Sequence, residues 1–168
     1  MRKAICMFAL GAIAAGVLVA QEKLRMKAPP AFETLKMLVG TWEGPNPEGG
    51  IERDVIRLIS NGTAIEEIVQ ARQDNQMVTI YAPDGERIAM THFCSIGNQP
   101  RMGTKATTAN QKEFDFTFSG GTNIAGPDDP QMNHLLLRIV DKDHFIEVWG
   151  FSMKGKVQQS TIQFMRKS

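Results

Sequence analysis

The residues of this sequence most suited to chemistry are His92 and Cys94, which lie two positions apart. Side chains with this spacing on a β-strand point the same way. A thiolate beside an imidazole can bind a soft metal ion or form a nucleophile–base pair. A zinc site needs at least three protein ligands, and the other histidines, His134 and His144, have no cysteine near them in the sequence. The pattern therefore favours a hydrogen-bonded histidine beside a buried cysteine over a catalytic or metal site.

Two other places could contact a ligand. Asn98, Gln99 and Arg101 form a polar segment with two amides and a guanidinium, which could bind a carboxylate at the mouth of a cavity. Equally, a loop of this composition can satisfy its own backbone. His134 lies near the start of an expected strand. It could be an axial haem ligand or an exposed histidine at the rim.

The elements that must position these residues are mainly short β-strands. From Thr41 onward, turn signals recur about every ten residues, and Asn61-Gly62 is the strongest two-residue hairpin signal. Runs rich in β-branched and aromatic residues lie between the turns. Before them, apolar residues spaced three and four apart predict one short helix that Gly40 ends. We expect strands near 41–45, 51–60, 63–72, 76–82, 86–94, 103–109, 112–118, 132–140, 144–153 and 156–166.

Alternation along the strands indicates which side chains are buried. Phe114, Phe116 and Phe118 share one face of their strand, and all three rings are expected to be buried. A meander of about ten strands would expose two edges, so closure into a barrel is the natural solution. The sequence therefore predicts an all-β domain over residues 31–168. Its fold is an antiparallel up-and-down barrel of about ten strands, preceded by the short helix.

The start of the first strand carries a resemblance to known proteins. A short helix running into Gly40-Thr41-Trp42, followed by many antiparallel strands, resembles the calycin superfamily of lipocalins, fatty-acid-binding proteins and haem-binding nitrobindins. The segment 38–44 is similar to nitrobindins, and the segment 91–102 looks like exported bacterial lipocalin-like proteins. The resemblance implies that Trp42 packs against a basic residue of the last strand, here Arg166, and closes one barrel end. The sequence departs from nitrobindins after Gly44, where a Pro-Asn-Pro segment follows.

The N-terminal residues predict an exported protein. Arg2 and Lys3 precede an uncharged run, Ala4 to Ala20, which is typical of a signal peptide over residues 1–20. The run is slightly short for a membrane span, although an uncleaved anchor is the alternative. Residues 21–30 have no apolar period and are expected to form a linker. We therefore expect a periplasmic or secreted protein without stable membrane insertion after cleavage.

Composition narrows the function further. The 168 residues carry 19 Lys+Arg and 18 Asp+Glu, so the basic excess that nucleic-acid binding needs is missing. The expected function is binding of a small apolar or amphipathic molecule inside the barrel, without a cofactor. The alternatives are a nitrobindin-like haem protein with His134 or His92 as axial ligand, an enzyme using His92 and Cys94, and a filled barrel that acts through its surface. The residues expected to contact the ligand are Met90, His92, Cys94, Arg101, Phe114, Phe116, Phe118, His134 and Trp149.

Overall fold

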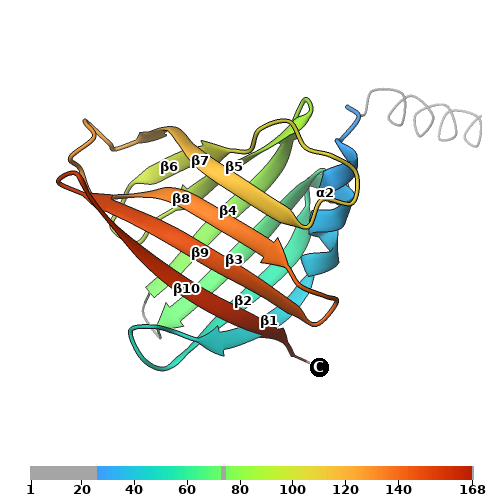
Figure 1. Cartoon of the computed structure of the whole chain (residues 1–168), viewed down its shortest axis with the longest axis horizontal. Coiled ribbons are helices and arrows are strands. Elements are labelled where there is room, and N and C mark those ends of the chain that lie inside the picture. The colour runs from blue at the N-terminus through green and yellow to red at the C-terminus, as the bar shows by residue number, and fades with distance from the viewer. Residues whose placement is uncertain (1–25, 73–74, 168) are drawn as a thin grey trace, which may run out of the picture.

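The computed structural model describes residues 26–72 and 75–167, which form a closed antiparallel β-barrel (Figure 1). Each strand pairs with its neighbours in sequence, and β1 pairs with β10 to close the ring. The expected signal peptide, 1–20, and the first part of the expected linker lie outside the described residues. The strands are β1 (Gly40–Pro45), β2 (Ile51–Ile59), β3 (Ala64–Arg72), β4 (Asn75–Asp84), β5 (Arg87–Phe93), β6 (Gln99–Gly103), β7 (Glu113–Thr122), β8 (Gln131–Ile139), β9 (His144–Met153) and β10 (Lys156–Arg166).

The predicted fold class, an up-and-down barrel of ten antiparallel strands behind a short helix, is confirmed. One strand was misplaced, because β6 occupies Gln99–Gly103 and not 103–109. Pro100 and its polar neighbours suggested a loop, yet Pro100, Met102 and Thr104 alternate inward and are buried. After β6 the chain leaves the sheet, and the backbone N–H of Thr104 donates to Ile88 O at 2.9 Å.

The helix α2 (Pro30–Leu35) and the 3₁₀ turn η1 (Lys36–Leu38) cover one end of the barrel (Figure 1). Pro30 occupies the first turn, where its missing N–H costs nothing and its fixed φ suits the helix. The buried side chains Phe32, Leu35 and Leu38 face the barrel interior. Within the described residues, no helix is both long and apolar enough to cross a membrane.

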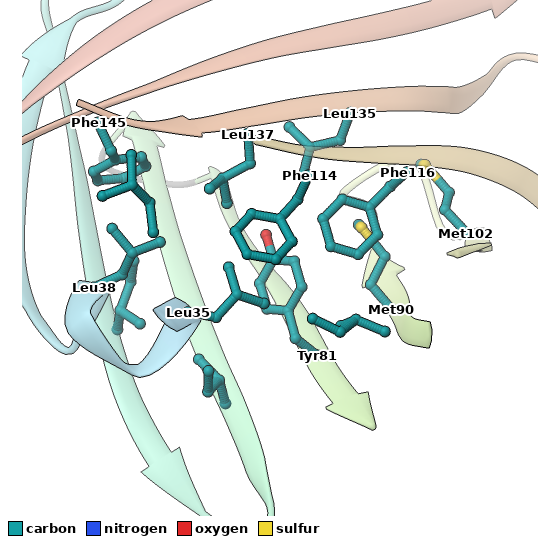
Figure 2. Close-up of a cluster of buried hydrophobic side chains, with 14 of the residues drawn as sticks. Leu35, Leu38, Tyr81, Met90, Met102, Phe114, Phe116, Leu135, Leu137 and Phe145 are labelled. Carbon is teal, nitrogen blue, oxygen red and sulfur yellow. The ribbon is translucent and has the colours of Figure 1, made fainter. Parts of the chain in front are cut away.

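Apolar side chains fill the half of the barrel nearest the helix (Figure 2). Leu35 from α2 lies beside Phe114 and Tyr81 there, and the Tyr81 and Phe116 ring centroids lie 5.6 Å apart. Phe114 and Phe116 are fully buried, as expected, but Phe118 is 37% exposed, so the prediction of three buried rings is wrong for it. The β7–β8 pairing ends at Thr117, one residue earlier, so Phe118 has a paired strand on one side only.

The seam that closes the barrel is short and depends on Trp42. Only Trp42↔Arg166 and Glu43↔Met165 pair directly between β1 and β10. The buried Trp42 ring packs edge-on against Phe145 at 4.8 Å, and its indole N–H donates to Leu38 O at 2.7 Å. The Arg166 guanidinium lies 4.0 Å from the Trp42 ring centroid, so the two residues expected to close this end are in contact.

The Arg166 guanidinium also ties the last strand to the exit of the helix. It donates hydrogen bonds to the carbonyl oxygens of Lys142, Val39 and Met37 at 2.7–2.8 Å. Gly40 leaves room for this group, because a Cβ there would lie 2.3 Å from Arg166 Nη1. The helix, the first strand and the last strand are therefore held at one point.

Candidate functional site

A cavity of about 470 Å³ occupies the end of the barrel opposite the helix. Its wall comes from the strand ends on that side: the starts of β2, β4, β8 and β10, and the ends of β3, β5 and β9. Val69, Met132, Trp149 and Ile162 provide apolar surface. The barrel is therefore filled at one end and hollow at the other, and the hollow end is the candidate binding site.

His92 is the central polar group of the cavity wall. It is 1% exposed, and its Nδ1 lies 2.9 Å from Thr79 Oγ1 on the neighbouring strand β4. Its ring lies 4.9 Å from the Trp149 ring, centroid to centroid. Its Nε2 has no hydrogen-bond partner among the described residues. Burial lowers the pKa of His92 to about 4, so the ring is neutral at pH 7.

Glu52 is the most deeply buried acidic residue that lines the cavity. It points inward from β2, is 5% exposed, and its Oε2 accepts a hydrogen bond of 2.6 Å from the Asn46 side-chain amide. Burial raises the pKa of Glu52 above its ordinary value, and the nearby charge of Glu48 adds to the rise. The cavity therefore contains a carboxyl group whose ionised form is poorly compensated by its surroundings.

Three more carboxyl groups lie between the cavity and the apolar core. Asp54, Glu67 and Glu147 point inward from β2, β3 and β9, and oxygen atoms of the three lie within 4.8 Å of one another. The Tyr81 hydroxyl donates to Glu67 Oε2, and the Trp149 indole N–H donates to Glu147 Oε2, both at 2.7 Å. We call Asp54, Glu67 and Glu147 the carboxyl cluster.

The carboxyl cluster retains protons at pH values where exposed carboxylates have lost theirs. Burial is the main cause that raises the pKa of all three groups, and it brings the pKa of Glu67 to about 7. The like charges of the neighbouring carboxylates raise the pKa of Asp54 and Glu147 further. Protons shared between the carboxyl groups give hydrogen bonds to oxygen atoms that have no other partner among the described residues.

The sequence reasoning missed the carboxyl cluster and Glu52. The available signal was strand alternation, since Glu67 shares its face with Ile65 and Val69, and Glu147 shares its face with Phe145 and Trp149. An acidic residue in the inward register of an apolar strand face is unusual and predicts a buried polar site. What alternation cannot show is that strands β2, β3 and β9 bring these acids together across the barrel.

The residues expected to contact a ligand fall into three places. His92, Cys94 and Trp149 line the cavity. Met90, Phe114 and Phe116 belong to the filled half of the barrel. Arg101, on the outward face of β6, and Phe118 are exposed. His134 is half-buried on the outer surface, where its Nε2 lies 2.6 Å from Asp115 Oδ1.

Cys94 and His92 therefore lie on one wall, as their spacing predicts. Cys94 is half-buried, and its backbone N–H donates to Asn98 O at 3.0 Å. In the part of the chain that the structure describes, no hydrogen bond joins the two side chains. His92 instead has Thr79 as its partner. The pair can contact the same ligand, but its geometry is not that of an activated nucleophile with its base.

Comparison of the sequence with known protein families and with curated proteins finds no match. The class of the protein is therefore defined by its architecture. It is a closed, ten-stranded, antiparallel β-barrel with a cavity at one end, which is consistent with a calycin-like fold and compatible with binding a small molecule.

Proposed function

We propose that this protein is an exported, lipocalin-like carrier of a small amphipathic molecule, held in the cavity at the open end of the barrel. The observation that carries the proposal is the cavity itself. Its volume of about 470 Å³ lies within the roughly 300–1,000 Å³ of typical ligand sites. Apolar wall residues together with the carboxyl group of Glu52 suit a ligand with an apolar body and a polar end.

The filled half of the barrel limits where such a ligand sits. Phe114 and Phe116 are 0% exposed and pack with Tyr81 and Leu35 under the helix, so this half has no room for a ligand. The cavity therefore favours the carrier function. It argues against a filled barrel that acts only through its surface. Binding then depends on the residues that line the cavity, on the side of the carboxyl cluster away from the apolar core. Trp149 and Ile162 contact the apolar part of the ligand there.

The proposal is tested by native mass spectrometry of residues 21–168 purified from the export compartment, together with an absorbance scan. We expect an additional mass of a small molecule that is lost on denaturation. Ser160 faces the cavity, and Ser160→Phe fills it with a ring. Thr161→Phe is the matched control, since it places the same ring on the exposed face of β10. Retention of the bound molecule by Ser160→Phe would place it elsewhere and refute the proposal.

The same absorbance scan tests the haem alternative. His92 is the histidine on the cavity wall, whereas His134 and His144 pair with Asp115 and Asp141 on the outside. Histidine is a common axial ligand of haem, so His92 is the residue that this alternative requires. A Soret band that disappears in His92→Ala would favour a haem protein over a carrier of an amphipathic molecule.

Export is the second part of the proposal and has its own measurement. A signal peptide over residues 1–20 predicts a periplasmic or secreted protein whose N-terminus is Gln21. Cell fractionation with the intact mass of the purified protein determines both the compartment and the cleavage site. A full-length mass in the cytoplasmic fraction would overturn this part and leave the cavity proposal unaffected.

A further inference from the structure

The charges around the cavity differ from what an acidic ligand needs. The described residues of its wall include the carboxyl groups of Glu48 and Glu52 and no lysine or arginine. Arg101, which the sequence offered as a partner for a carboxylate, lies on the outer face of β6. His92 adds no positive charge at pH 7, because burial lowers its pKa to about 4. The wall is therefore neutral or negative throughout its described part.

We infer that the polar end of the ligand is a protonated amine that pairs with Glu52. This inference rests on the proposed function and names the chemical class of the ligand. Glu52 is 5% exposed, and Asn46 supplies one hydrogen bond to its Oε2. An ammonium group beside Glu52 compensates a buried carboxylate, and ion pairs of low exposure are favourable when their remaining hydrogen bonds are made.

His92 lines the same cavity as Glu52. Its Nδ1 lies 2.9 Å from Thr79 Oγ1, and its ring lies 4.9 Å from the Trp149 ring, centroid to centroid. Because this ring is neutral at pH 7, it does not repel an ammonium group beside Glu52.

The rest of the cavity suits the same ligand class. Trp149 lines the wall, and indole is the aromatic ring that attracts organic cations most strongly. The indole N–H of Trp149 donates to Glu147 Oε2 at 2.7 Å, which fixes this ring on the cavity wall. A carboxylate ligand meets the opposite conditions, because it would be buried beside Glu52 without a described cation to pair with.

Three octyl probes that differ only in their polar end test the inference. Octylammonium, octanol and octanoate are titrated into residues 21–168 at pH 7 by calorimetry. We expect octylammonium to bind about tenfold or more tightly than octanol, the range that close charge pairs reach, and octanoate to bind weakest. In Glu52→Gln, which retains an acceptor for Asn46, the preference for the amine over the alcohol is expected to disappear while octanol still binds. Glu86→Gln on the exposed surface is the control.

The outcomes separate the inference from the proposed function. Octanol or octanoate binding at least as tightly as the amine, with binding lost in Ser160→Phe, would overturn the inference and support the carrier. An amine preference that persists in Glu52→Gln would also overturn it. If none of the probes binds, or Ser160→Phe binds them unchanged, both the carrier proposal and the inference fail.

Discussion

Replacing Glu67 by Gln should stabilise the barrel by an amount that grows with pH. Glu67 is fully buried, and its pKa is raised from 4.5 to about 7, mainly by loss of hydration. The folded barrel therefore binds this proton more tightly than the unfolded chain. Stability from this group is greatest below pH 4.5 and is lost as the pH rises through 7, because the unfolded chain releases the proton first. Gln retains the acceptor for Tyr81 and cannot ionise.

The size of the effect follows from the pKa of Glu67. One proton held more tightly in the folded state changes the free energy of unfolding by about 1.4 kcal/mol for each pH unit. Between pH 4.5 and 7 the wild type should therefore lose about 3 kcal/mol relative to Glu67→Gln. His92 titrates in the opposite direction, since its pKa is lowered. It remains in both proteins, so the comparison between them removes its contribution. Asp54 and Glu147 face the same space, and burial raises their pKa values as well, so they lower the stability of both proteins as the pH rises.

Urea unfolding followed by tryptophan fluorescence at pH 5, 6, 7 and 8 measures this difference. We expect the stability advantage of Glu67→Gln to increase steadily from pH 5 to 7. Glu86→Gln, on the exposed surface, controls for the loss of one negative charge and should show no such trend. A stability difference that is the same at every pH would show that Glu67 is ionised in the folded barrel throughout, and the reasoning about the carboxyl cluster would be wrong.

Three further outcomes are expected from other parts of the barrel. Trp42→Ala should lower the free energy of unfolding by about 3–5 kcal/mol in urea denaturation, because it removes a fully buried ring at the seam; a loss below 1 kcal/mol would contradict this role. Gly44→Ala should reduce the melting temperature, since its Cβ would lie 2.5 Å from Gln163 O, whereas Gly126→Ala, with open space around it, should not. Cys94 should react with a thiol reagent in the folded protein and be protected by a bound ligand, because it is half-buried on the cavity wall; labelling only after denaturation would refute this.

Much of the fold could be predicted from the sequence because local patterns determine it. Hairpin turns follow one another along the chain, so each strand finds its partner next in sequence, and turn residues such as Asn61 mark the ends. Local patterns failed at β6, where Pro100 and polar neighbours concealed inward alternation. They also failed at Phe118, whose exposure depends on where the pairing with β8 ends.

The candidate site was less predictable than the fold. The sequence placed His92 and Cys94 on one side of a strand, which the structure shows as one wall of the cavity. It could not show which half of the barrel is filled, because Phe116 and Trp149 have equally apolar strands around them. That division depends on the helix, whose Leu35 enters one end of the barrel and leaves the other end open.

The seam between β1 and β10 has a consequence for how the chain reaches its final form. All other strand pairs join neighbours in sequence, but the hydrogen bond from Arg166 to Val39 spans 127 residues. Closure of the ring requires the final strand and carries the largest loop-closure cost of any strand pair, because its partners lie furthest apart in the sequence. Until then β1 and β9 present two unpaired edges, which are sites for aggregation. A chain that lost β10 would keep both edges exposed permanently, so the last strand protects the molecule as much as it stabilises it.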